Sequence, residues 1–411
     1  MKLGINGMGR IGKLSLWTHL ARKRFSEIVV NLGREVGTGL VDLVESVEKD
    51  STYGRLSHYL HGVHGGRIIE NLEEATGRMT IDGVPVRFLR SGRNPKEIAW
   101  RENGVSLVVD CTGAFVDPTR SGDFANGALR GHLEAGAQKV LLSAPFKVQN
   151  QGMPIPNDAV TTVMGINAEV YNPAQHSLIS AASCTTTCLS FMMKPIMDHY
   201  GVDRILSASM VTVHASTSSQ FVLDSIPAAG AKDLRKSRSI QNNIILTTTG
   251  AAKALRLVLP EMAEVGFMAE SVRIPTTTGS LTILTLNLQS ESRENPINRN
   301  DINGIYREAA QGAYQGYLEY SEEQNVSSDM IGFPKAATVI EARETHTRTA
   351  FIRLNLDRIP GMSQAMLATL PEHTLEAPVT QVVVYGWYDN ELGSYANMLG
   401  DLTEYVADNM I

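Results

Sequence analysis

Two residues of the 411-residue chain have the side chains for thiol chemistry. Cys184 lies in the stretch SAASCTTTCLS, directly before a run that predicts a helix from about Thr185. His214 lies in SMVTVHAST, at the end of an apolar run that predicts a strand. A thiol becomes nucleophilic as a thiolate, and a nearby imidazole or helix N-terminus favours that form. Cys184 and His214 are therefore a candidate nucleophile and base.

This pair alone leaves other roles open for the cysteines. Buried cysteines often act as small apolar residues, and most cysteine and histidine residues of one sequence are unrelated. Cys184 and Cys188 are spaced C-x₃-C, but no second ligand pair follows, so we expect no metal site. The chain has three cysteines in all, which form no even disulfide framework and are typical of a reduced, cytoplasmic protein. Cys188, one helical turn after Cys184, is expected to pack in the interior.

A glycine pattern near the N-terminus predicts a nucleotide site. Gly7, Gly9 and Gly12 form G-x-G-x-x-G between a predicted strand, KLGING, and a predicted helix. Gly7 permits the tight turn, Gly9 lets a diphosphate approach the backbone, and Gly12 lets the helix pack closely on the strand. The helix N-terminus adds free N–H groups and positive potential. We expect dinucleotide binding here; a purely structural turn is the alternative.

The end of the second predicted strand bears on which dinucleotide binds. EIVVNLG ends without the Asp or Glu that binds the ribose hydroxyls of NAD, and Gly33 and Arg34 stand there instead. Without that carboxylate a 2′-phosphate is not repelled, and an arginine can pair with it. We therefore expect NADP to be accepted, either alongside NAD or in preference to it. Arg34 is otherwise a solvated loop residue, and Glu35 or Asp42 could fold back onto the ribose and restore NAD selectivity.

The pattern around these residues predicts two kinds of sheet. Strands and helices alternate up to about residue 183, which favours an α/β, doubly wound, Rossmann-type sheet. SLTILTLNLQ, TAFIRLNLD and TQVVVYGWY then alternate as antiparallel strands do, which favours an α+β catalytic domain with a mostly antiparallel sheet. RMTIDGVPVRFL predicts a hairpin, GALRGHLEAGA a helix, and 358–378 loops with a short helix. The expected domains are 1–183 with 390–411, and 184–389.

The composition argues against several other classes. Hydrophobic residues make up 43% and charged residues 19%, enough for buried cores and unlike a disordered chain. The net charge of −6 offers no basic field for nucleic acid. No apolar run is long enough to cross a bilayer, and the first residues lack the apolar core of a signal peptide. We expect neither nucleic acid nor membrane as a partner.

Several motifs together resemble one enzyme family. NGMGRIG, DCTGAF, SAASCTTTC, VTVHAST, TTTGAAK, VRIPT and WYDNELG follow the order and spacing of the phosphorylating glyceraldehyde-3-phosphate dehydrogenases. The resemblance implies an NAD(P)-dependent enzyme of glycolysis, a cytoplasmic homotetramer that oxidises an aldehyde phosphate to an acyl phosphate through a cysteine thioester. Cys184 would attack the aldehyde. His214 would lower the pKa of the thiol and take the hydroxyl proton.

The same resemblance implies the binding residues. Asn390 would hold the nicotinamide amide, and Tyr388 would pack beside the ring and the histidine. The expected cofactor residues are Asn6, Gly7, Met8, Gly9, Arg10, Ile11, Gly33, Arg34, Thr112, Gly113, Ser143 and Asn390. The residues expected to bind the substrate phosphate and inorganic phosphate are Ser183, Thr185, Thr217, Ser219, Arg238, Thr249, Gly250 and Arg273.

The chain also departs from the family pattern. Ala181 and Thr187 replace two asparagines of SNASCTTNC, and Phe221 replaces the lysine of TATQK. The lost lysine and the stretch AAQGAYQG favour erythrose-4-phosphate dehydrogenase, whereas the intact TTTGAAK favours glyceraldehyde 3-phosphate. A regulatory or binding protein on the same scaffold is a third interpretation, against which the intact site residues argue. The chain is longer than typical members, with extra segments near 34–47, 117–125, 147–162 and 343–375.

Overall fold

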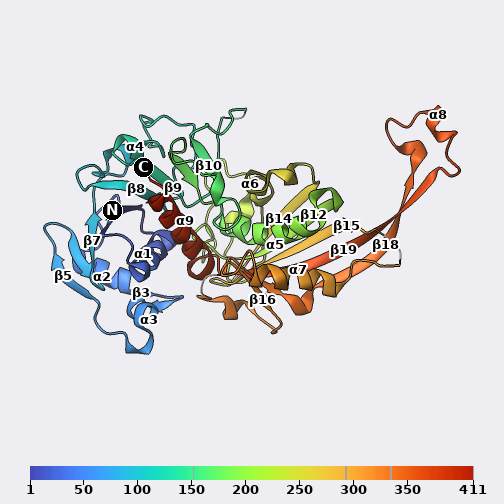
Figure 1. Ribbon diagram of the computed structural model, residues 1–411. Coiled ribbons are helices and arrows are strands. Elements are labelled where there is room, and N and C mark those ends of the chain that lie inside the picture. Colours follow the sequence, from blue (N-terminus) through green and yellow to red (C-terminus); the bar gives the residue numbers. More distant parts are fainter. Residues whose placement is uncertain (151, 292–293, 334–335, 411) are drawn as a thin grey trace.

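The computed structural model describes the chain except residues 151, 292–293, 334–335 and 411 (Figure 1). Two large sheets organise the described residues. The first has nine strands, in the order β10-β11-β9-β8-β1-β2-β7-β6-β5. The second has eight, in the order β13-β14-β12-β15-β19-β17-β16, with β18 paired to β19. This mixed α/β arrangement confirms the predicted fold class.

The first sheet is parallel over most of its width. Its buried strands read as continuous apolar runs because helices cover both faces. The C-terminal helix α9 returns to this sheet and packs against α1, where Arg22 pairs with Asp401 at 2.5 Å. The parallel strands are β1 (Lys2–Asn6), β2 (Glu27–Asn31), β7 (Val84–Leu89), β8 (Val105–Asp110), β9 (Lys139–Leu142), β10 (Ala159–Thr161) and β11 (Leu178–Ser180). The helices are α1 (Arg10–Arg22), α2 (Leu40–Glu48), α3 (Leu56–His61), α4 (Gly131–Glu134) and α9 (Asn397–Asp408).

The antiparallel edge of this sheet contains the predicted hairpin. β6 (Arg78–Ile81) pairs antiparallel with β7 and with β5 (Ile69–Glu73). Asp82 and Gly83 make its turn at φ +47° and +81°, the left-handed region that an Asp-Gly turn needs. The small pair β3 (Lys49–Asp50) and β4 (Gly54–Arg55) lies apart. The expected helix in GALRGHLEAGA is correct only over the single turn of α4, because hydrogen-bonded turns flank it.

The second sheet is mostly antiparallel, as predicted. β15 (Ser280–Gln289) lies between β12 (Ile205–Ala215) and β19 (Thr374–Tyr388), and α5 (Cys184–Tyr200) packs on them. Leu284, Leu286 and Leu288 are fully buried while their neighbours alternate outward, which produces the period-two pattern. The remaining elements are β13 (Ile245–Thr247), β14 (Phe267–Ile274), β16 (Leu318–Ser321), β17 (Thr338–Glu341), β18 (His346–Asn355), α6 (Ala251–Val258), α7 (Arg299–Gln311) and α8 (Gln364–Leu367).

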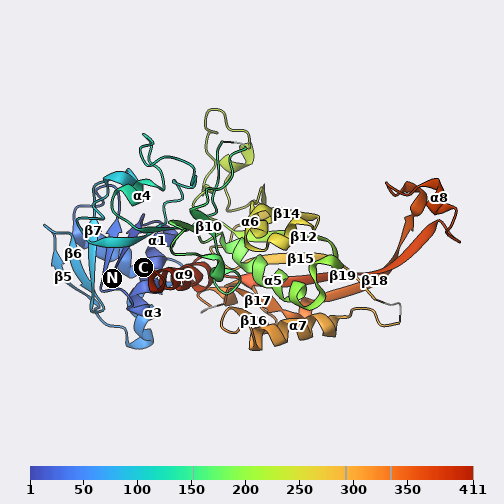
Figure 2. The ribbon, with the colours of Figure 1, turned by 45° about the horizontal axis from the view of Figure 1, so that its top comes forward.

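A long arm projects from the second sheet (Figures 1 and 2). β18 and the first half of β19 pair from His346 with Val383 out to Asn355 with Thr374, and α8 lies at the tip. Part of the segment 358–378 that we expected to be loop is therefore strand, since β19 begins at Thr374. The polar and apolar residues of this segment alternate too irregularly to predict a strand from the sequence.

The tip of the arm is expected to contribute little to stability. Of residues 356–373 only Leu367 is buried, and β18 pairs with no strand but β19 among the described residues. Replacing 356–373 by Asn-Gly should therefore shift the thermal midpoint by no more than about 2 °C, because less than about 1 kcal/mol is lost. Leu284→Ala is the control that should cost about 2–5 kcal/mol. A large drop with the shortened arm would show that the tip contacts the body.

His19 on α1 is a buried histidine that should make the fold sensitive to acid. Both of its ring nitrogens lack a hydrogen-bond partner among the described residues, and the ring packs edge-on to Phe25. Burial, with a smaller effect of Arg22, lowers the pKa of His19 to about 3. The unfolded chain therefore binds a proton below about pH 6.5 that the folded chain does not, and stability is lost as the pH falls from there toward 3.

Urea unfolding at pH 7, 6 and 5 tests this expectation. Below about pH 6.5, protonation of His19 in the unfolded chain should lower the free energy of unfolding by up to about 1.4 kcal/mol per pH unit, and His19→Leu should abolish this contribution. His64→Leu, at an exposed histidine, is the matched control and should leave the pH dependence unchanged. Equal pH slopes in wild type and His19→Leu would contradict the assignment.

None of the described helices combines the length and apolar character needed to span a bilayer.

Candidate active site

Cys184 is the first residue of α5, directly after a sharp turn. Ala182 has the left-handed φ of +55°, and the Ser183 hydroxyl caps the helix by accepting the Thr186 N–H at 3.1 Å. Asn, Asp, Ser and Thr favour this capping position because their side-chain oxygens satisfy a free N–H. The thiol therefore lies at a helix N-terminus, where the helix dipole favours a negative charge.

His214 lies beside this thiol. It is the second-last residue of β12, and its Nε2 is 3.4 Å from the Sγ of Cys184. Its Nδ1 is 2.7 Å from the carbonyl oxygen of Ala215. The tautomer with hydrogen on Nδ1 donates to that carbonyl and leaves Nε2 free to accept the thiol proton. The structure thus brings the two residues together at hydrogen-bonding distance.

Arg273 completes a cluster of three groups. β14 runs parallel to β12 with Arg273 opposite His214. Its Nη1 lies next to His214 Nδ1, and in the tautomer with hydrogen on Nδ1 both nitrogens donate to the Ala215 carbonyl oxygen, Nη1 at 3.1 Å. Its Nε is buried and has no hydrogen-bond partner among the described residues. An unpaired buried donor on a cation is suited to an anionic oxygen, so this guanidinium fits a phosphate or carboxylate.

The charges of the cluster favour a neutral pair in this structure. Burial and then the charge of Arg273 lower the pKa of His214 to about 3. Burial raises the pKa of the Cys184 thiol, and the charge of Arg273 opposes that rise. The nearby positive charge that favours a thiolate is thus Arg273, whereas the sequence assigned this effect to His214.

Tyr388 ties three elements of the site together. Its hydroxyl is 2.9 Å from Oγ1 of Thr185 on α5 and 2.8 Å from Oγ1 of Thr212 on β12. Its ring meets the His214 ring edge-on, with the centroids 6.0 Å apart. These contacts fix the distance between the helix that carries the thiol and the strand that carries the imidazole. The expected packing of Tyr388 against the histidine is confirmed.

Asn390 lies in the turn after β19 and is fixed by side chains of the sheet. Its Oδ1 accepts from the Ser280 hydroxyl at 3.0 Å, and that hydroxyl accepts the N–H of Ala215 at 3.0 Å. Asp389 accepts the N–H of Gly393 at 2.8 Å and the hydroxyl of Tyr53 at 2.8 Å. This fixes the turn next to the backbone of His214.

The glycine pattern has the geometry that a bound diphosphate needs. Gly7 has a φ of +93°, and a Cβ on Gly12 would lie 1.9 Å from the Gly7 carbonyl oxygen, so no other residue fits there. Gly9 caps α1, and a Cβ there would meet nothing within 4 Å. The backbone before α1 is therefore open to a ligand, and these residues fit a dinucleotide.

A pocket of about 320 Å³ lies at this end of the parallel sheet. Thr112 and Arg34 reach it from the ends of β8 and β2, and Arg93 from the loop after β7. Neither arginine forms an ion pair among the described residues, whereas Glu35 pairs with Arg90 at 3.4 Å. The lining residues are Asn6, Gly7, Asn31, Leu32, Gly33, Arg34, Arg93, Thr112, Ala114 and Phe115.

Sequence reasoning missed Arg93 and a chain of buried polar groups. Asn31 donates to Asn6 at 2.8 Å, Asn6 donates to Asp110 at 2.8 Å, and Asp110 is 3.0 Å from His132 Nε2. These bonds join the ends of the three central strands under the pocket. Predicting Arg93 would have required knowing that β7, the strand before it, pairs with β2, and the sequence does not show that pairing.

Some expected site residues have other contacts. Arg238 pairs with Asp224 at 3.1 Å, and 63% of its side chain is exposed, so the structure does not bring it to Cys184. The guanidinium of Arg10 binds Glu391 and Asp50 rather than lining the pocket.

The other expected residues lie at turns and helix ends. Met8 and Ile11 pack against the core of the first sheet, and Gly113 and Ser143 follow β8 and β9. The hydroxyls of Thr217 and Ser219 are 2.9 Å apart, and Thr249 and Gly250 directly precede α6. The described residues contain no group of three or more His, Cys, Asp or Glu that could hold a metal ion.

A nucleotide-type pocket on a parallel sheet, together with a thiol on α5 paired with an imidazole on the second sheet, is typical of oxidoreductases that use a nicotinamide dinucleotide. Two family models match the chain. Residues 1–118 match the glyceraldehyde 3-phosphate dehydrogenase NAD binding domain, and residues 183–355 match the C-terminal domain of the same family. The chain belongs to the glyceraldehyde-3-phosphate dehydrogenase family.

Curated relatives agree along the whole length. The chain is 34% identical to glyceraldehyde-3-phosphate dehydrogenase 2 of Streptomyces avermitilis over 411 residues, which cover 100% of this chain and 99% of that protein. It is 34% identical to glyceraldehyde-3-phosphate dehydrogenase of Geobacillus stearothermophilus, covering 99% and 98%. It is 33% identical to glyceraldehyde-3-phosphate dehydrogenase 1 of Bacillus subtilis, also covering 99% and 98%.

Proposed function

We propose that this oxidoreductase is a phosphorylating glyceraldehyde-3-phosphate dehydrogenase, which oxidises the aldehyde to an acyl phosphate with NAD(P) and inorganic phosphate. The observation that carries the proposal is the 3.4 Å approach of Cys184 Sγ to His214 Nε2, with the buried, unpaired Nε of Arg273 next to them. This reaction needs three groups in one place: a nucleophile, a proton acceptor and a hydrogen-bond donor for an anion.

The first chemical step follows from the neutral thiol and imidazole. The thiol proton passes to Nε2 of His214 as Sγ bonds to the aldehyde carbon, and the new oxyanion lies at the N–H groups that begin α5. The imidazolium returns its proton to the oxyanion, and neutral His214 then removes it as the carbon is oxidised. Bound dinucleotide supplies the acceptor for the hydride. The product on the enzyme is a thioester of Cys184.

Inorganic phosphate then cleaves that thioester. Its oxygen attacks the acyl carbon, Sγ leaves as the thiolate, and Arg273 offers a charge-assisted hydrogen bond to the anion. Thr249 and Gly250 at the start of α6, and Ser183 and Thr185 at the start of α5, supply further donors by motif position. Arg238 would have to leave its ion pair with Asp224 before it could contribute.

We also propose that NADP is accepted as well as NAD. Arg34 and Arg93 line the pocket at the end of β2, and none of the described residues that line it carries a carboxylate. Of the two acids that could restore NAD selectivity, Glu35 pairs with Arg90, and Asp42 accepts the N–H and hydroxyl of Thr38. Both are thus engaged elsewhere.

The cofactor proposal predicts a selective loss. Arg34→Ala and Arg93→Ala should each lower kcat/KM for NADP by about tenfold while changing that for NAD less than about twofold, because each arginine's charge-assisted bonds go to the 2′-phosphate. The NADP loss should shrink at high salt, since exposed pairs are screened. Arg358→Ala, on the exposed arm, is the control. Strict use of NAD by wild type would refute the proposal.

One steady-state experiment tests the reaction itself. Glyceraldehyde 3-phosphate and erythrose 4-phosphate are each assayed with NAD and NADP, with and without inorganic phosphate. We expect glyceraldehyde 3-phosphate to be the better substrate and turnover to require phosphate. Faster oxidation of erythrose 4-phosphate would favour the alternative that Phe221 suggests, and no turnover with either would favour a binding protein.

We further propose, from the family, a homotetramer in the cytoplasm, with domain boundaries near Ser183 and Asn390. The return of α9 to the first sheet supports assigning 390–411 to the nucleotide-binding domain. Light scattering on the purified protein measures the assembly.

A further inference from the structure

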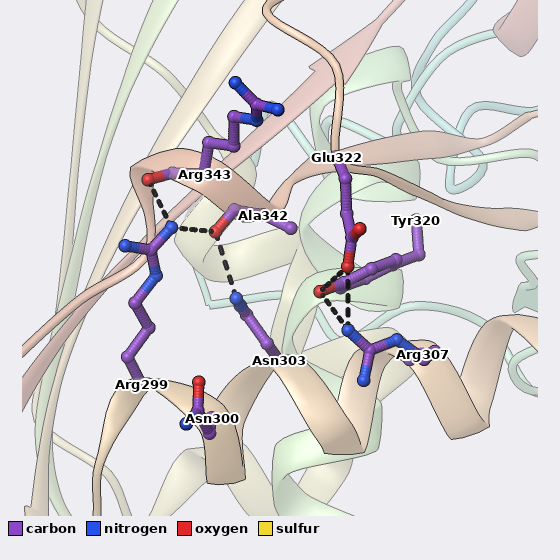
Figure 3. A pocket seen from close by; sticks show the side chains of 8 residues that line it. All are labelled: Arg299, Asn300, Asn303, Arg307, Tyr320, Glu322, Ala342 and Arg343. Carbon is purple, nitrogen blue, oxygen red and sulfur yellow. Dashed lines mark hydrogen bonds and ion pairs between the residues drawn. The ribbon is translucent and has the colours of Figure 1, made fainter.

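A second pocket lies beside α7, away from the thiol (Figure 3). Its volume is about 320 Å³. Residues of α7 form one side of it, and residues on and just after β16 and β17 form the other. The proposed reaction uses none of them. The lining residues are Arg299, Asn300, Asn303, Arg307, Tyr320, Glu322, Ala342 and Arg343.

The lining carries excess positive charge. Arg299 and Arg307 lie about two helical turns apart on α7, and Arg343 lies in the segment after β17, with its exposed side chain directed away from both of them (Figure 3). Arg307 pairs with Glu322 at 2.8 Å, but neither Arg299 nor Arg343 forms an ion pair among the described residues. The lining thus has three arginines and one carboxylate, on a chain whose net charge is −6. This concentration of positive charge attracts an anion.

Arg299 is held in place for such a role. Its Nη2 donates to the carbonyl oxygens of Ala342 at 3.1 Å and Arg343 at 2.6 Å (Figure 3). A guanidinium has five N–H donors, so these bonds fix its plane and leave donors for a ligand. A fixed guanidinium loses less side-chain entropy on binding than a mobile one.

Asn303 supplies a second and independent sign of a ligand. It lies between Arg299 and Arg307, and only 8% of it is exposed. Its Nδ2 donates to the Ala342 carbonyl at 3.0 Å, but its Oδ1 is buried without a hydrogen-bond partner among the described residues. An unpaired buried acceptor costs about 1–3 kcal/mol. A hydroxyl of a bound molecule would satisfy it.

We propose that this pocket binds a small organic phosphate that carries a hydroxyl group. The phosphate oxygens bind Arg299, which is held in place, and the exposed side chain of Arg343 turns toward them, because a dianion with three oxygens matches two guanidinium groups. The hydroxyl donates to Oδ1 of Asn303. The volume of about 320 Å³ is sufficient for a small polyol phosphate or sugar phosphate.

Calorimetric titration of the full chain with glycerol 3-phosphate tests the proposal at low salt. Arg273, and Arg34 with Arg93, are also proposed to bind phosphate groups, so the titration of each variant is compared with that of wild type. Arg299→Gln/Arg343→Gln should bind one equivalent fewer, or bind it at least about tenfold more weakly. Arg273→Ala should keep that equivalent and lose binding at the active site, which separates this proposal from the proposed function. Arg256→Gln, an exposed arginine of α6, should change nothing. A titration of the double variant equal to that of wild type would overturn the proposal.

Two further measurements keep the test independent of folding. Arg343→Gln alone removes an exposed side chain that makes no hydrogen bond among the described residues, so it should fold normally and still weaken the site about threefold or more. Methyl phosphate, which lacks a free hydroxyl on its carbon chain, should bind this site more weakly than glycerol 3-phosphate. Equal affinity for the two compounds would refute the role of Asn303.

Discussion

Cys184→Ser should abolish dehydrogenase turnover while the protein stays folded. A serine hydroxyl has nearly the shape of the thiol but is far harder to ionise, so the acyl-enzyme bond cannot form at a useful rate. The thermal midpoint should change little because Cys184 lies at a helix start rather than deep in the apolar core. Steady-state assay with glyceraldehyde 3-phosphate and circular dichroism measure the two parts.

Cys188→Ser is the matched control. Cys188 lies one turn further along α5, fully buried, with its Sγ 2.7 Å from the hydroxyl of Thr338. Burial raises the pKa of this thiol to about 12, so it is not a thiolate near neutral pH. Its replacement should therefore leave turnover within a few-fold of wild type. Iodoacetamide should inactivate the variant at the same rate as wild type. Equal activity in the two variants would disprove the assignment of the nucleophile.

His214→Asn should lower turnover by about 10²–10⁴-fold, the usual contribution of general acid–base catalysis. Turnover falls because the variant has no imidazole Nε2 beside Sγ to accept the thiol proton of Cys184. The pKa of His214, lowered to about 3, also means that protonation of this imidazole should not inhibit the enzyme between pH 7 and 5. A pH profile of kcat/KM checks this.

The control for this variant is His199→Asn, at an exposed histidine of α5. It should leave kcat and the pH profile unchanged. The rate at which Cys184 is alkylated is a separate readout, because it depends on the thiol pKa. The charge of Arg273 opposes the rise in that pKa. Unchanged turnover in His214→Asn would refute the role of His214 as the base.

Local chemistry in the sequence determined much of the nucleotide site. Gly7, Gly9 and Gly12 act through their own backbone and that of immediate neighbours, so their spacing was sufficient to predict the turn before α1. The serine cap of α5 and the turn at Asp82 and Gly83 are equally local. The alternation in SLTILTLNLQ predicted a strand of a half-covered sheet for the same reason, since burial on one face follows from side-chain direction alone.

The tertiary structure decided what depends on pairing between distant strands. The register of β12 with β14 places Arg273 opposite His214, and this alone makes Arg273 the charge that acts on Cys184. The order of the first sheet brings Arg93 to the pocket beside Arg34. No short-range pattern encodes such registers, because they follow from which apolar faces pack together across the whole sheet. The same reason explains the arm, where β18 and β19 stay paired beyond the body, and the burial of Asn303 of α7, whose Oδ1 has no hydrogen-bond partner among the described residues.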